Sequence, residues 1–326
     1  MTTILRSVSL VALLFPARMA LAQDYPVPYL TGDGKYQYVD AATMQPVFSG
    51  TFDMAQPFRS GIALAEVQGH HRYLLPSGQQ AMNITFAEGN SFRGDRAVIY
   101  RDGASQLINK QGKTIPPNEN IQEWTIAEGR AVVVNKAGKA GYIDVESGLQ
   151  TVPVIYEAAR AYSEGLAAIR QNNKWGFIDK SGRNVVPAIY DDVTAFGEGL
   201  AGVRVNNKWG AIDMNGRMVI SPRFEKITSF ASGHAFVQIT NGSWGIIDRN
   251  GNASNVRLPF QTIYPLSEGL SGFMHDNLWG FVDANGKIII QPAYIRASSF
   301  VDGIAMVIKG NQRFYIDKQG REFRNK

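Results

Sequence analysis

A tandem repeat constrains the fold of this chain more than any other feature. The motif Lys174-Trp-Gly-Phe-Ile-Asp-Lys-Ser-Gly182 returns with small changes at residues 208–216, 243–251 and 278–286. The glycines that open successive units stand 34 or 36 residues apart; they are Gly129, Gly165, Gly199, Gly233, Gly269 and Gly303, with Gly61 as an earlier member. A fixed period of this size indicates a repeat architecture, in which each unit is one supersecondary element.

One unit, residues 163–196, shows the local pattern most clearly. Residues 164–170 alternate as a strand does, and Asn172-Asn173 supplies a tight hairpin turn. A second strand follows, which ends at the turn Lys180–Gly182. Residues 184–190 form a third, short strand whose Pro187 confines it to a sheet edge. Each unit is therefore predicted to be a three-stranded meander plus a connector.

The units match the repeat motif less closely towards both ends of the chain. Tyr36 stands in the Trp position of the first unit, and Arg313 stands there in the last. Capping repeats commonly depart from the consensus in this way, because their outer faces are exposed to water. We expect one repeat domain over residues 24–326, with degenerate repeats at 24–126, well-matched repeats at 127–300 and a capping repeat at 301–326.

These motifs resemble the bacterial WG (or KWG) repeat family. Its consensus of Glu-Gly, Lys-Trp-Gly-Phe-Ile-Asp, Gly-Lys and Pro-x-Tyr-Asp is matched closely at residues 163–196 and recognisably from about 127 to 320. The resemblance implies a β-rich, multi-unit extracytoplasmic protein. Most members of the family have no assigned reaction, so it supplies no catalytic residue.

The predicted fold is all-β, with about nine short three-stranded antiparallel meanders that form an open, solenoid-like stack. A closed β-propeller is the alternative. Propeller blades usually have four strands and run past about 40 residues. The shorter period of 34 residues favours the open stack.

The repeated Trp-Gly pair has two interpretations. A ladder of indoles could stack on sugar rings, or the indoles could seal one unit against the next, and a residue required once per unit favours packing. The Gly after each Trp fits packing, because a missing Cβ lets a neighbouring backbone approach. The pairs are Trp175-Gly176, Trp209-Gly210, Trp244-Gly245 and Trp279-Gly280.

A recurring Asp precedes each second turn, at Asp179, Asp213, Asp248 and Asp283 among others. Calcium needs six to eight oxygens gathered in one place, whereas each turn here carries one Asp. An Asp side chain that accepts N–H groups of its own turn explains the spacing. We therefore expect no metal and no cofactor.

One column of the first strand varies in charge and size. The position five after the opening Gly is a candidate binding face, at Tyr100, Arg170, Arg204, Gln238 and Met274 among others. Its neighbour, four after the Gly, is apolar in every unit and should face the core; it reads Ala65, Ile99, Val133, Ile169, Val203, Val237, Phe273 and Val307. Repeat proteins present extended faces of this kind to partners.

No catalytic constellation stands out. The four histidines, His70, His71, His234 and His275, fall at unrelated positions of the units, and the chain contains no Cys. We therefore expect no enzyme activity. The formal net charge of +5 includes no basic run, so we expect no nucleic-acid partner.

The first 22 residues resemble a cleaved secretory signal. Arg6 precedes an apolar run from Val8 to Phe15, and Ala20-Leu21-Ala22 supplies small residues before Gln23. No later stretch reaches the length of about 20 apolar residues that a membrane span needs. The expected location is the periplasm or the exterior, with no membrane span in the mature chain.

We interpret the chain as a non-catalytic module that binds another protein. The alternatives are a module that binds cell-wall or other glycans, and an immunity-type binder of a secreted toxin.

Overall fold

The computed structural model describes residues 25–101, 103–115, 120–239, 242–254 and 256–325, and every regular element within these ranges is a β-strand. The predicted signal peptide, residues 1–22, lies outside them. No helix in the described ranges has the length and apolar character needed to cross a bilayer.

The strands of the described residues form nine small antiparallel sheets, each made of strands that follow one another in the chain. The first five sheets contain β1 (Val27–Leu30) and β2 (Tyr36–Val39); β3 (Met54–Ala55), β4 (Ala63–Val67) and β5 (His70–Leu74); β6 (Glu88–Gly89), β7 (Arg96–Arg101), β8 (Ala104–Asn109) and β9 (Thr114–Ile115); β10 (Asn120–Ala127), β11 (Arg130–Val134), β12 (Ala140–Asp144) and β13 (Gln150–Tyr156); and β14 (Ala158–Ser163), β15 (Leu166–Gln171), β16 (Lys174–Asp179) and β17 (Asn184–Tyr190). The other four contain β18 (Asp192–Val193), β19 (Leu200–Val205), β20 (Lys208–Asp213) and β21 (Met218–Phe224); β22 (Lys226–Ile227), β23 (His234–Gln238) and β24 (Trp244–Asp248); β25 (Thr262–Ile263), β26 (Leu270–His275), β27 (Leu278–Asp283) and β28 (Ile288–Tyr294); and β29 (Arg296–Ala297), β30 (Ile304–Lys309), β31 (Gln312–Asp317) and β32 (Glu322–Phe323).

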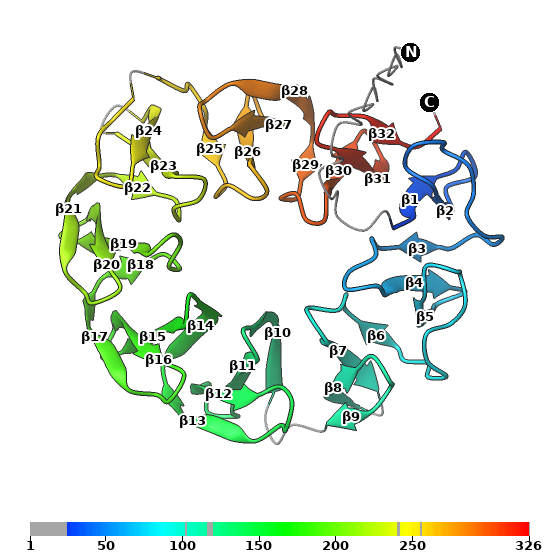
Figure 1. The fold of residues 1–326 in the computed structure, drawn as a ribbon, viewed down its shortest axis with the longest axis horizontal. Coiled ribbons are helices and arrows are strands. Elements are labelled where there is room, and N and C mark those ends of the chain that lie inside the picture. Colours follow the sequence, from blue (N-terminus) through cyan, green and yellow to red (C-terminus); the bar gives the residue numbers. More distant parts are fainter. Residues whose placement is uncertain (1–24, 102, 116–119, 240–241, 255, 326) are drawn as a thin grey trace, which may run out of the picture.

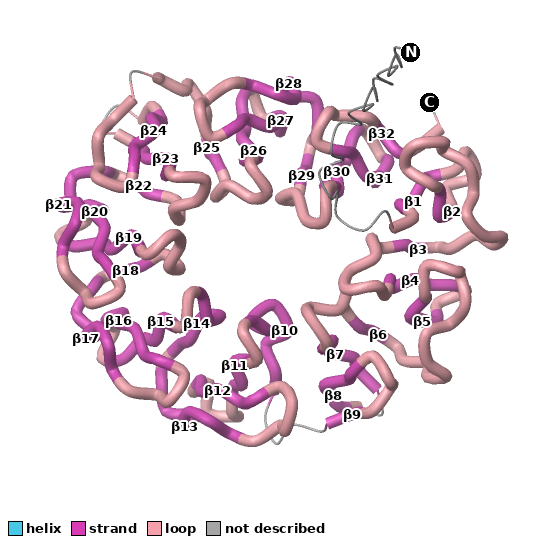
Figure 2. Tube along the Cα trace, in the orientation of Figure 1, coloured by secondary structure: helices cyan, strands magenta, loops and turns pink. Residues whose placement is uncertain are grey.

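The sheets stand side by side around a closed ring (Figure 1, Figure 2). In the described residues, eight of them begin with a strand on the inner side of the ring, namely β3, β6, β10, β14, β18, β22, β25 and β29. The remaining sheet, β1–β2, lacks this inner strand and lies between the last sheet and the sheet β3–β5. This arrangement is an eight-bladed β-propeller with one extra two-stranded sheet at the seam.

The predicted open, solenoid-like stack is therefore wrong, and the alternative closed propeller is the observed architecture. The prediction failed because each connector was interpreted as a loop. In most units the connector pairs with the next strand over two residues, as Asp192 and Val193 do with Arg204 and Val203. A unit of 34 residues thus holds four strands, and its short period does not exclude a propeller blade.

Local chemistry explains the strand ends within a blade. Asn172 and Asn173 take left-handed φ angles of 52° and 59°, which Asn tolerates and the two-residue hairpin requires. Pro187 lies in β17, the outermost strand of its sheet. The N–H that proline lacks is not needed at a sheet edge, and a proline there discourages pairing with another chain.

The core lies between neighbouring blades. All eight members of the apolar column are buried, each at most 1 % exposed; they are Ala65, Ile99, Val133, Ile169, Val203, Val237, Phe273 and Val307. The prediction that this column faces the core is confirmed. Between the fifth and sixth sheets, Phe177 packs edge-on against Phe196 with ring centroids 4.7 Å apart. Such pairs stabilise beyond the area that they bury.

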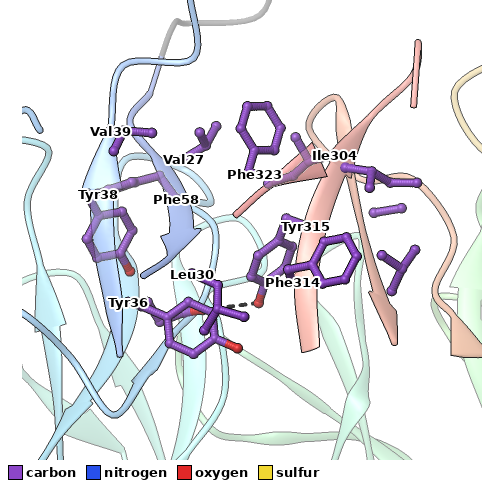
Figure 3. Packing of buried hydrophobic residues seen from close by; sticks show 14 of the residues in the cluster. Val27, Leu30, Tyr36, Tyr38, Val39, Phe58, Ile304, Phe314, Tyr315 and Phe323 are labelled. Carbon is purple, nitrogen blue, oxygen red and sulfur yellow. Dashed lines mark hydrogen bonds between the residues drawn. The ribbon is translucent and has the colours of Figure 1, made fainter. Parts of the chain in front are cut away.

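The two ends of the chain meet in one apolar cluster (Figure 3). Tyr38 and Phe58 from the first two sheets pack in the same cluster as Phe314, Tyr315 and Phe323 from the last sheet. An open stack would leave the apolar face of residues 301–326 exposed. In the ring the first units cover it.

Hydrogen bonds also cross this seam. The Tyr36 hydroxyl donates to the Arg313 carbonyl at 2.7 Å, and the Tyr315 hydroxyl donates to the Ala55 carbonyl at 3.1 Å. The Asn325 N–H donates to the Leu30 carbonyl at 3.0 Å. In other blades the residue just before the inner strand makes the corresponding bond; the Asp191 N–H, for example, donates to the Arg204 carbonyl at 3.0 Å. The chain end therefore reproduces one hydrogen bond of the inner strands, although it meets Leu30 in a parallel bridge where the inner strands pair antiparallel.

Candidate functional site

The repeated indoles lie within and between blades rather than on an open surface. Trp244 is 3 % exposed and Trp175 is 9 % exposed, while Trp209 and Trp279 are half-buried. The Arg160 guanidinium covers the Trp175 ring at 4.1 Å from its centroid. Trp279 stacks on Tyr264 at 4.4 Å.

The glycines after these tryptophans mark a close backbone approach. A Cβ added at Gly176, Gly210 or Gly280 would lie within 2.6 Å of a carbonyl oxygen of the neighbouring outer strand. Those outer strands, β17, β21 and β28, each run for seven residues and change register beside the glycine. At Gly245 the backbone atom nearest to an added Cβ is 3.8 Å away. Among the described residues, β24 is the last strand of its sheet, so no outer strand crosses this glycine. The glycine is required where a long outer strand crosses it.

Each repeated Asp closes its own turn. The Asp179 carboxylate accepts the backbone N–H groups of Ser181 and Arg183 at 3.0 and 3.1 Å. The bonds from the Ser181 hydroxyl and from these backbone groups lower the pKa of Asp179 to about 2. The same pair of backbone contacts recurs at Asp213, Asp248 and Asp283. Within the described ranges, no three His, Asp or Glu side chains gather where they could hold a metal ion.

The Glu before the opening Gly has a role that the sequence did not reveal. The Glu164 carboxylate accepts the backbone N–H groups of Glu198 and Gly199 in the next blade, at 2.7 and 2.8 Å. In the same way, the Gly233 N–H donates to the Glu198 carboxylate, and the Gly165 N–H donates to the Glu128 carboxylate. The Glu-Gly repeat was visible in the sequence, but nothing local showed that the carboxylate reaches a turn one blade away.

The variable column follows one face of the ring. Each member lies near the end of the second strand of its blade, opposite the Trp position; Arg170 pairs with Trp175, Arg204 with Trp209, Gln238 with Trp244 and Met274 with Trp279. Tyr100 is 45 % exposed, and the other four are half-buried.

Two members of the column already have partners in their own blade. Arg170 donates to the Asn173 side chain at 2.8 Å, and Gln238 donates to the Gly242 carbonyl at 2.9 Å. The side chains of Tyr100, Arg204 and Met274 make no such hydrogen bond with a described residue. The structure thus brings the five predicted residues to one face, and these three are the freer ones.

Comparison with known proteins identifies the repeat. The model described as "WG containing repeat" matches residues 141–175, 175–209, 209–242, 244–279 and 279–312, which together make up more than half of the chain. This chain belongs to the WG containing repeat family. The comparison with curated proteins finds no match to this chain.

Solved structures of low sequence identity share the fold of this WG-repeat protein. A structure titled as the eukaryotic initiation factor superposes with a TM-score of 0.58 at 11 % identity, covering 92 % of this chain and 95 % of its own. The computationally designed Ika8 protein superposes with a TM-score of 0.51 at 10 % identity, covering 93 % and 97 %. BamB from Moraxella catarrhalis has a TM-score of 0.48 at 13 % identity, covering 82 % and 91 %. At these identities the first two likenesses concern the fold alone.

Proposed function

We propose that this WG-repeat protein is a non-catalytic module, exported to the periplasm or the exterior, that binds another protein through one face of its ring. The variable column carries this proposal. Eight blades present the same strand position on one face, and that position varies while its neighbour is uniformly apolar and buried. A surface relieved of packing constraints in this way suits recognition of a partner.

The side-chain types on this face favour a protein partner over a glycan. Tyr100, Arg204 and Met274 combine an aromatic ring, a guanidinium and a flexible thioether, and all three side-chain types are enriched at protein interfaces. A glycan site would need open aromatic faces, whereas the ring of Trp175 is covered by Arg160 and that of Trp279 by Tyr264. We therefore place wall glycan second.

The partner proposal is tested by cross-linking the purified mature chain in a periplasmic extract, then measuring the affinity of the captured protein by calorimetry. The triple variant Tyr100→Ala/Arg204→Ala/Met274→Ala should lose at least about tenfold in affinity, because such residues carry interface energy. The control variant Ile155→Ala/Ile189→Ala/Met218→Ala removes exposed apolar side chains from the outer strands and should bind normally. Equal binding by all three proteins would reject the proposed face.

Two further measurements separate the alternatives. Saturable binding of soluble peptidoglycan fragments, lost in the triple variant, would replace the protein partner with a wall glycan. Mass spectrometry of the exported form should find Gln23 at the N-terminus. A full-length product retained in the cytoplasm would contradict export.

A further inference from the structure

A cavity of about 230 Å³ lies at the seam where the ring closes. Residues of the first two units and of the last unit line it, among them Tyr36, Gln56, Arg59, Ser299, Arg313 and Tyr315. It does not include the variable column, so it is separate from the proposed partner face.

Two departures from the repeat accompany this cavity. The sheet β1–β2 has no inner strand among the described residues. Arg313 also stands in the position that an indole fills in the central units. Among the described residues, the interface therefore lacks two groups that the central units have, an inner strand and an indole, and the cavity lies there.

The charge in the cavity is unbalanced. Within the described ranges, neither Arg59 nor Arg313 forms an ion pair, and the Nε atom of Arg59 is buried without a hydrogen-bond acceptor. Asp302 and Glu268 act on Arg59 only through space. The Glu268 carboxylate is already engaged by Lys318 at 3.1 Å and by the N–H groups of the next turn. A buried donor without an acceptor is costly, and an anionic ligand would relieve that cost.

The neighbouring polar groups suit an oxyanion. The Tyr36 and Tyr315 hydroxyls donate to backbone carbonyls across the seam, so they join the two sides of the cavity and are already engaged. The Ser299 hydroxyl, in contrast, makes no hydrogen bond with a described residue. A guanidinium offers paired N–H groups that match a carboxylate or a phosphate. The volume of about 230 Å³ is close to that of about eight water molecules in the liquid, which suits a small ligand.

We propose that this seam cavity binds a small oxyanion, a carboxylate or a phosphate, through Arg59 and Arg313. Because the walls come from opposite ends of the chain, such a ligand also ties the ring closed. It should raise the unfolding temperature, since a ligand that binds only the closed ring stabilises that state.

The test uses the mature chain at constant ionic strength, with malonate, succinate and inorganic phosphate titrated separately by calorimetry and by thermal unfolding. We expect saturable binding of at least one of them, and the carboxylate and phosphate arms identify which chemistry the cavity prefers. At a hundredfold excess over Kd the midpoint should rise by at least about 3 °C.

Variants separate a site from general screening of charge. Arg59→Gln and Arg313→Gln should each weaken binding at least about tenfold, because glutamine cannot form the charge-assisted pair. Arg217→Gln is the matched control, since it removes one exposed positive charge in a distant turn. Arg313 is exposed, so its variant carries the test even if Arg59→Gln fails to fold. Absence of saturable binding by all three anions, or equal loss in Arg217→Gln, would overturn the proposal.

Discussion

The interfaces between the central blades and the seam between the two chain ends close the same ring by different means. In the central blades one short set of signals recurs: Trp, Gly and Asp in fixed positions, and a Glu that reaches the next turn. At the seam Arg313 replaces the Trp, and buried Phe314 replaces the Gly. The outer strand there, β32, has only two residues, so no backbone crosses the position and an aromatic ring can fill it.

This difference shows which repeated residues are needed within a blade and which contacts are needed to close the ring. The close backbone approach at the Gly of the pair belongs to blades with a long outer strand, as at Gly176, Gly210 and Gly280. The ring needs only that consecutive blades bury complementary faces, and at the seam an aromatic cluster from both ends does so.

The largest expected effect comes from removing the seam. A chain that ends at Phe300 lacks β30, β31 and β32, and with them Phe314, Tyr315 and Phe323. Each buried aromatic contributes about 1.5–3 kcal/mol, so the loss approaches the whole stability of a typical domain, about 5–15 kcal/mol. We expect no cooperative transition in circular dichroism or calorimetry above about 25 °C.

The full mature chain is the control for this truncation. Retention of the full-length melting midpoint by the truncated chain would mean that blades fold independently, and the seam would then be dispensable.

The sequence allowed three strands of each unit and their turns to be predicted, because each unit contains its own turn and strand signals, but the two-residue inner strand was interpreted as a connector. The Asn172-Asn173 turn, the edge strand with Pro187 and the buried column that includes Ile169 all follow from local patterns. Closure did not follow from them. Closure of the ring depends on the angle between successive units. It also depends on contacts between residues at opposite ends of the chain, such as the hydrogen bond from the Tyr315 hydroxyl to the Ala55 carbonyl.

Of the two candidate sites, one could be predicted from the sequence and the other could not. The variable column was found because its packed neighbour is uniform, and a periodic alignment displays both. The cavity at the seam was missed because its two arginines, Arg59 and Arg313, belong to degenerate units far apart in the sequence. Only the closed ring brings them together.

The next largest effect compares the Trp position in a central blade and at the seam. Trp244→Ala should cost about 3–5 kcal/mol of unfolding free energy, because the indole is 3 % exposed. Arg313→Ala should change it by less than about 0.5 kcal/mol, because that side chain is exposed. Half-buried Trp209→Ala should fall between them. Urea titration at constant slope measures all three, and equal losses at Trp244 and Arg313 would remove the distinction.

The Gly position gives a smaller and more specific contrast. In Gly210→Ala the new Cβ would lie 2.2 Å from the Ile220 carbonyl oxygen, and such overpacking costs about 1–3 kcal/mol. Gly245→Ala is the matched control, because its nearest neighbour atom is 3.8 Å away, and it should stay within about 0.5 kcal/mol of the parent. A Gly210→Ala variant with the parent stability would show that the outer strand moves aside, and the crossing would then not explain the glycine.

The smallest expected effect asks whether the seam is as firmly closed as a central interface. The Tyr315 hydroxyl donates to the Ala55 carbonyl at 3.1 Å across the seam, and the Tyr142 hydroxyl donates to the Arg160 carbonyl at 2.8 Å between two central blades. Replacing either by Phe leaves a carbonyl without this donor and should cost about 0.5–1.5 kcal/mol. Because the two tyrosines occupy the same place in their blades, a closed ring predicts equal losses within about 0.5 kcal/mol in paired urea titrations. If Tyr142→Phe is destabilising and Tyr315→Phe is neutral, the hydroxyl at the seam is already bound to water, which means that the ring opens there in solution before the blades unfold.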